Sequence, residues 1–115
     1  MWVAAYVAAI VLASPLAPDS TPRYTQLAVA KAARNLREYD TAAAWYDAAI
    51  ARNPDDIDAL AGRMLTAADA GRRETVRALV DSTAALAEES RDLQLARAGA
   101  LHTVGEHLAA LGLYD

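Results

Sequence analysis

The fold prediction rests on the segment Leu36–Asp56, which reads LREYDTAAAWYDAAIARNPDD. Its centre is rich in alanine, the residue with the highest helix propensity, and Pro54 cannot continue a helix. Asp55 or Asp56 can cap a helix that follows. The segment therefore predicts one helix that ends near Asn53 and a second helix that begins a few residues later.

From residue 23 onward, and including this segment, the sequence repeats with a period of 34 residues. Gly71 and Gly105 are 34 apart, and each is expected in a turn between two helix-like runs. The period divides the chain into the frames 23–56, 57–90 and 91–115, of which the second is degenerate and the third is partial. We predict helices over 23–36, 39–52, 57–70, 73–88, 91–104 and from 107 onward.

These frames predict an all-α fold, an antiparallel helix-hairpin solenoid of about 2.7 repeats. Two short helices approach closely only where the contact positions are small or well filled, and one hairpin cannot bury its apolar faces alone. Small residues and a few larger plugs recur at matching positions of the frames. The residues expected to pack the repeats are Ala30, Tyr39, Ala42, Tyr46, Ala49, Pro54, Ala67, Gly71, Ala98 and Gly105.

The first frame carries the spacing Tyr-x2-Ala-x3-Tyr-x2-Ala-x4-Pro, as Tyr39, Ala42, Tyr46, Ala49 and Pro54. With this spacing it resembles the tetratricopeptide repeat (TPR) family, and the period extends the resemblance over residues 23–115. Four positions depart from the family pattern, one of them Gln26, where an aromatic residue is common. Arg37 stands where a turn glycine is usual, Thr83 replaces a small alanine, and Glu88 replaces the proline.

The resemblance implies a protein-interaction scaffold, because the first helices of such repeats commonly line a concave surface that receives a peptide or partner protein. Mapped by frame, basic side chains gather in the first repeat and acidic ones in the other two, a polarity that could orient a charged partner. A solvated helix face with ordinary charges explains the same residues. The expected groove residues are Tyr24, Lys31, Arg34, Asn35, Asp58, Leu65, Asp69, Asp92, Leu95 and His102.

The first 13 residues, MWVAAYVAAIVLA, form a separate, uncharged segment. As a helix it would be about 20 Å long, shorter than the ~30 Å hydrocarbon core of a bilayer. The segment resembles a signal peptide or anchor, followed by a proline-rich linker over 14–22. This predicts a chain that is exported, periplasmic or membrane-anchored. The alternatives are a hydrophobic helix that packs on the repeats and a cytoplasmic location.

Composition excludes several classes of function. The net charge of −4 argues against a nucleic-acid partner, and the absence of cysteine excludes disulfides and thiolate metal sites. His102 and His107 are five residues apart, not the four of a helical zinc pair. No nucleophile elbow or phosphate-binding loop occurs. We therefore expect no enzyme activity, no cofactor and no metal.

Three functional interpretations remain open. The first is a non-enzymatic scaffold that binds a protein or peptide, in the bacterial cell envelope. The second is a structural or oligomerisation module that self-associates through an exposed apolar end face. The third is the periplasmic TPR portion of an outer-membrane polysaccharide export protein.

Overall fold

The computed structural model describes residues 21–110, with the backbone alone for 106–110. The expectations for residues 1–13 and most of the linker lie outside this part. The described chain is all-α, as predicted. Within it the helices are α2 (Arg23–Asn35), α3 (Tyr39–Arg52), α4 (Ile57–Asp69), α5 (Arg73–Ser82), α6 (Ala84–Ala87) and α7 (Arg91–Ala110).

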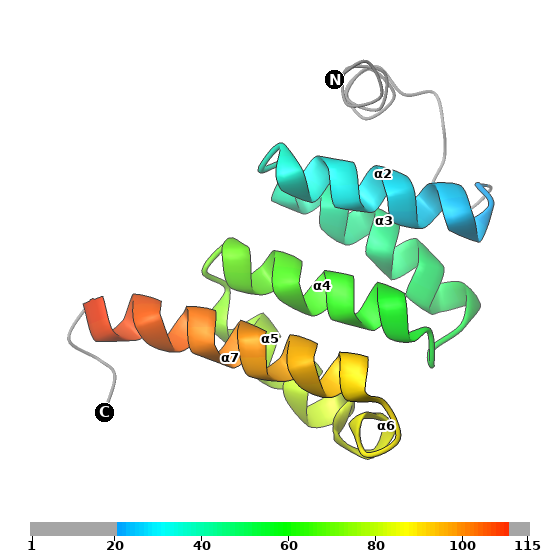
Figure 1. Cartoon of the computed structure of the whole chain (residues 1–115). Helices are drawn as coiled ribbons and strands as arrows, with labels where there is room; N and C mark the ends of the chain where they lie inside the picture. The colour runs from blue at the N-terminus through cyan, green and yellow to red at the C-terminus, as the bar shows by residue number, and fades with distance from the viewer. Residues whose placement is uncertain (1–20, 111–115) are drawn as a thin grey trace.

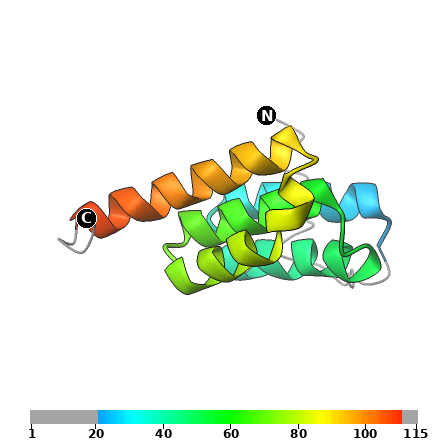
Figure 2. The ribbon, with the colours of Figure 1, turned by 90° about the horizontal axis from the view of Figure 1, so that it is seen from below.

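The helices form two layers (Figures 1 and 2). In the front layer, α2, α4 and α7 run side by side in the same direction, and in the back layer α3 and α5 run the opposite way. The first hairpin is α2 with α3, and the second is α4 with α5 and the short α6. The central helix α4 packs against α3, α5 and α7, so it joins the two hairpins to the last helix.

Two turns between paired helices use the same backbone conformation at positions 34 residues apart. Gly71 has φ 72°, and Arg37 has φ 62°, the only non-glycine residue in the left-handed region within 21–110. Glycine adopts this conformation without steric cost, whereas a side chain at Cβ is strained there. The arginine at the turn position therefore keeps the turn geometry in spite of its side chain.

The core consists of two apolar clusters. In the first hairpin, Val29 and Ala30 of α2 pack with Trp45 and Tyr46 of α3. The larger cluster joins the second hairpin to α7, and its buried residues are Leu60, Met64, Ala67, Ala68, Val76, Ala87, Leu93, Ala100 and Val104. Alanine at many of these positions lets the helix axes approach closely.

The residues predicted to pack the repeats differ in how deeply they are buried. Ala30, Ala42, Ala49 and Ala67 are buried, and Tyr46 is buried between α3 and α4. Tyr39 is half-buried at the start of α3. Two others act in turns instead of in the core, because Pro54 and Gly71 are exposed there.

The prediction of one helix over 73–88 was wrong, because the structure divides it into α5 and α6 at Thr83. The Thr83 side chain is buried, and its Oγ1 donates to the Leu79 carbonyl oxygen at 2.6 Å. Thr66 and Thr103 make the same kind of bond inside the unbroken helices α4 and α7, so the hydroxyl bond alone does not end a helix. At Thr83 the backbone itself leaves helical geometry, with φ −100° and ψ 4°.

The predicted turn at Gly105 was also wrong, because α7 continues through it to Ala110. Glycine inside a helix costs about 1 kcal/mol relative to alanine, which is too little to end a helix without other turn residues nearby. Gly105 is buried within this helix.

The third frame is out of register with the packing by one residue. The buried Ala33 and Ala67 are 34 apart, but the equivalent buried residue of α7 is Ala100, only 33 further on. Ala98 was expected in the helix contact and is exposed instead, because the buried face of α7 is formed by Leu93, Ala96, Ala100 and Val104.

Candidate interaction surface

The predicted groove residues lie on the three helices of the front layer. On α2, Tyr24, Lys31 and Asn35 are exposed, and the Tyr24 side chain is the most open large apolar group at 84%. Because α2 rises about 1.5 Å per residue, Tyr24 and Asn35 lie at opposite ends of this helix, about 16 Å apart along its axis. The α2 part of the surface is therefore an elongated strip.

The remaining predicted residues come from α4 and α7. On α4, Leu65 is half-buried beside α7, where a Cβ at Gly99 would lie 3.8 Å from its Cδ2. On α7, Asp92, Leu95 and His102 are exposed, with Leu95 at 61%. The exposed side chains of the front-layer helices thus include an aromatic ring, a lysine and an amide on α2, and an apolar and an acidic side chain on α7.

Part of the charge polarity expected for this surface is used within the molecule. Arg34 Nε of α2 donates to Asp69 Oδ2 of α4 at 2.7 Å, and both side chains are partly buried. This pair joins the C-terminal ends of two neighbouring front-layer helices. Arg34 and Asp69, which were expected to bind a charged partner, therefore bind each other.

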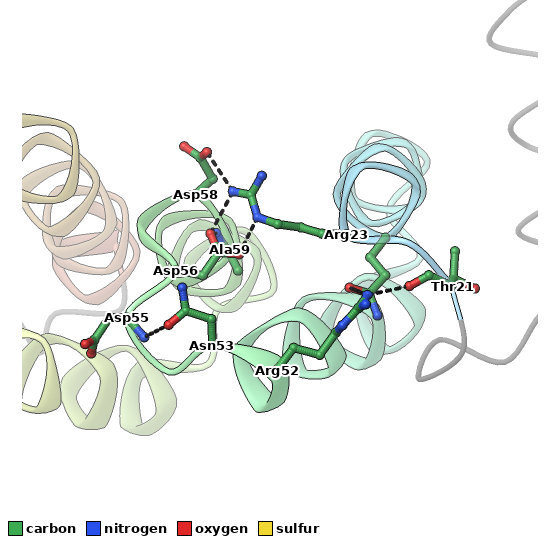
Figure 3. A network of polar contacts seen from close by, with 9 residues as sticks. Thr21, Arg23, Arg52, Asn53, Asp55, Asp56, Asp58 and Ala59 are labelled. Carbon is green, nitrogen blue, oxygen red and sulfur yellow. Dashed lines mark hydrogen bonds and ion pairs between the residues drawn. The ribbon is translucent and has the colours of Figure 1, made fainter.

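A polar network joins the other ends of α2 and α4 (Figure 3). Arg23 donates from Nε to Asp56 Oδ2 at 2.7 Å and from Nη2 to Asp56 Oδ1 at 2.9 Å. Arg23 Nη2 also donates to Asp58 Oδ2 at 3.1 Å. Asp56 itself caps α4, as predicted, because its carboxylate accepts from the Ala59 backbone N–H at 3.3 Å.

The same network attaches the start of the described chain to the first hairpin. Arg52, in the last turn of α3, donates from Nη1 to the Thr21 carbonyl oxygen at 2.7 Å. The same Nη1 lies 3.4 Å from Oε1 of the buried Gln26. An arginine at a helix C-terminus also complements the helix dipole. The chain that enters α2 is therefore fixed to the end of α3.

The charges of this network shift two pKa values. The hydrogen bonds from Arg23 lower the pKa of Asp56, and the bond from Ala59 acts in the same direction against the effect of burial. The hydrogen bond to Asp56 raises the pKa of Arg23. Both groups are therefore charged at neutral pH, and Asp56 caps α4 as a carboxylate anion.

The back-layer helix α3 contacts α4 through an aromatic ring that packs on a glycine. The sequence did not predict this contact. The Tyr46 ring lies over Gly62, where a Cβ would be 2.3 Å from Tyr46 Cε1 and Cζ. Burial of this ring raises the pKa of the Tyr46 hydroxyl. Gly62 is thus the residue of α4 that lets the first hairpin approach the second.

Sequence reasoning missed most of the ion pairs that join the hairpins. Except for Arg63 and Asp47, which are 16 residues apart, the partners that the structure describes in these pairs are 32 to 35 residues apart, close to the repeat period, as in Arg34–Asp69. The sequence signal that could have predicted such pairs is a basic and an acidic residue about one repeat period apart. Such pairs are expected when equivalent ends of successive hairpins lie side by side.

Metal binding and membrane insertion can be checked directly in the described residues. Within 21–110, no group of three or more histidine or carboxylate side chains is placed to hold a metal ion. In the same part of the chain, no helix combines the length and hydropathy needed to cross a bilayer.

These features define an all-α protein in which two helical hairpins and one long helix pack in two layers, with an exposed front face. Comparison of the sequence with protein-family models, with curated proteins and with solved structures gave no match.

Proposed function

We propose that the chain is a non-enzymatic interaction module with a TPR-like architecture, and that it binds a protein or peptide on its front face. The observation that supports this proposal is the parallel arrangement of α2, α4 and α7 in one layer. Parallel first helices form such a surface in stacked hairpin repeats. The motif of the first frame and the turn conformation shared by Arg37 and Gly71 agree with it.

The exposed residues of α2 are the best candidates for partner contact. Most of the surface of Tyr24 is exposed, and tyrosine is enriched at the energetically important positions of interfaces. Lys31 has no ion pair within the described residues, whereas Arg34 is engaged by Asp69. We therefore expect Tyr24 and Lys31 to contribute more to partner binding than Arg34.

Site-specific photo-crosslinking in cells tests this proposal. A photoreactive amino acid is placed at Tyr24 or Lys31 on the front face, and at Arg77, exposed on the back-layer helix α5, as the control. We expect a discrete crosslinked species from the two front positions, and its loss when Tyr24→Ala and Lys31→Glu are added at the unlabelled sites. Equal crosslinking from Arg77 would contradict a front-face binding site.

One observation favours the structural or oligomerisation module as a second candidate. Leu95 and Leu101 of α7 are both exposed, at 61% and 46%. Exposed leucines on one helix favour association. Size-exclusion chromatography with light scattering tests it, since a monomer at every concentration would exclude this candidate.

The cell-envelope location is also part of the proposal, and so is the relation to polysaccharide export. Both rest on the apolar composition of residues 1–13, which lie outside the described residues. Mass spectrometry of the chain expressed in a secreting host tests the location. Removal of the first segment would support export, and an intact chain in the cytosol would contradict it.

A further inference from the structure

A depression lies on the opposite side of the molecule from the front face, where α3 ends beside α5 and α6. Its volume is about 530 Å³. The large aliphatic side chains that line it are Ile50, Leu60, Leu79 and Leu86, and all but Leu60 are only half-buried. Because α3 and α5 do not pack closely against each other, their side chains leave this space between the hairpins.

Hydrogen bonds from α7 fix the shape of this depression. Arg97 Nη2 donates to the Val80 carbonyl oxygen at 2.9 Å, and Gln94 Nε2 donates to the Ala87 carbonyl oxygen at 2.7 Å. Together with the bend at Thr83, these bonds hold α5 and α6 in their relative positions. A preformed apolar site loses less entropy on binding than one that must first become ordered.

The charged groups that line the depression are all acidic. Asp47 and Asp55 contribute carboxylates, and no lysine or arginine of the described residues lines it. Asp47 is bound by Arg63 at 3.0 Å, whereas Asp55 forms no ion pair within residues 21–110. Glu88 and Glu89, which directly follow α6, are exposed and likewise unpaired in the described part of the chain.

We infer that this depression is a second interaction site, which receives an apolar side chain from a basic amphipathic segment of a partner protein. The apolar floor accommodates the side chain, and Asp55 with the nearby glutamates attracts lysine or arginine residues that flank it. This site is separate from the front face, so it does not depend on the function proposed there. Each surface can fail its own test while the other stands.

Methyl NMR of the full chain tests the inference. The chain has three isoleucines, and of the two in the described part Ile50 lines the depression, whereas Ile57 does not. The probes are two helix-forming peptides of equal length, one of leucine and lysine and one of leucine and glutamate. We expect the lysine peptide to shift the Ile50 δ1 methyl signal and to leave Ile57 unchanged, and the glutamate peptide to bind at least about tenfold more weakly.

Two variants complete the test. Ala85→Trp places a large ring in the depression and should abolish the Ile50 shift, whereas Ala84→Trp, at an exposed residue that does not line it, should preserve binding. Asp55→Lys should weaken binding by about threefold or more, and this arm remains decisive if Ala85→Trp does not fold. Equal affinity for the two peptides, an unshifted Ile50 signal, or full binding by Ala85→Trp would overturn the inference.

Discussion

Gly62 and Gly99 both lie inside helices, yet we expect the same substitution to have opposite effects at the two sites. In a helix interior, alanine is more favourable than glycine by about 1 kcal/mol. A Cβ at Gly99 would lie 3.8 Å from Leu65 Cδ2, which is an ordinary van der Waals contact. Gly99→Ala should therefore raise the free energy of unfolding by about 0.5–1 kcal/mol.

At Gly62 the added methyl group meets the Tyr46 ring. Its Cβ would be 2.3 Å from Cε1 and Cζ and 2.7 Å from the hydroxyl oxygen, whereas carbon atoms in contact are about 3.5–4.0 Å apart. The ring must move by more than about 1 Å, and only 4% of Tyr46 is exposed, so its neighbours must move too. Overpacking of this kind costs about 1–3 kcal/mol or more and outweighs the helical gain.

We therefore expect Gly62→Ala to lower the free energy of unfolding by about 1–3 kcal/mol, or the melting temperature by about 5–15 °C. Urea unfolding followed by the helical circular dichroism signal measures both substitutions. A Gly62→Ala protein as stable as the wild type would refute the close approach of Tyr46 to α4.

A double-mutant cycle separates the steric effect from other causes. Leucine at position 46 is too short to reach the space that Tyr46 Cε1 and Cζ occupy. In the Tyr46→Leu background, Gly62→Ala should become stabilising by about 1 kcal/mol, which corresponds to a coupling energy of about 2–4 kcal/mol. If Gly62→Ala were equally destabilising in both backgrounds, the ring would not be the cause.

The remaining predictions concern one turn and two ion pairs. Arg37→Gly should raise the free energy of unfolding by up to about 1 kcal/mol, because φ is 62° there, and a loss of stability in urea unfolding would contradict this strain. Asp56→Ala should lower the free energy of unfolding by about 2 kcal/mol, because the cap of α4 and the hydrogen bonds from Arg23 are lost together. A loss below about 0.5 kcal/mol would contradict the cap. The contribution of Asp56 should depend on pH. Because its pKa in the folded state is below the ordinary aspartate value of 3.8, the stability difference between wild type and Asp56→Asn should be full above about pH 4 and should shrink as the pH falls further. A stability difference that grows as the pH falls would show that folding raises the pKa of Asp56 instead of lowering it. Asp69→Asn should cost only about 0.5 kcal/mol, because its pair with Arg34 is partly exposed, and a loss of about 2 kcal/mol or more would show a larger role in docking α2 on α4.

The sequence predicted the helix starts closely because local chemistry determines them. The predicted starts at 23, 39, 57, 73 and 91 are the first residues of α2, α3, α4, α5 and α7. Proline at 22 and 54 and glycine at 71 mark three of these five boundaries in the sequence itself. Helix starts of this kind need no knowledge of the tertiary contacts.

The errors arose where the period of 34 was given more weight than the local residues. At Thr83 the period predicted a small residue inside a helix, but the backbone leaves helical geometry there, with φ −100° and ψ 4°. At Gly105 the period called for a turn, but none of the surrounding residues supports one and α7 continues. The one-residue shift that leaves Ala98 exposed depends on how α7 packs along α4, which no local pattern specifies.

The charges of the front face show why candidate binding residues are harder to predict than helices. Assigning exposed charges by frame treats Arg34, Asp58 and Asp69 as available to a partner. In the folded chain Arg34 binds Asp69, and Asp58 binds Arg23, because equivalent helix ends of neighbouring hairpins lie within hydrogen-bond distance. A charge in one repeat is thus satisfied by the opposite charge about one period later. A charged residue is therefore a better candidate for partner binding when no opposite charge stands at the repeat spacing to neutralise it. By this criterion Lys31 is favoured over Arg34, because the residues 33 to 35 positions after Lys31 are Met64, Leu65 and Thr66.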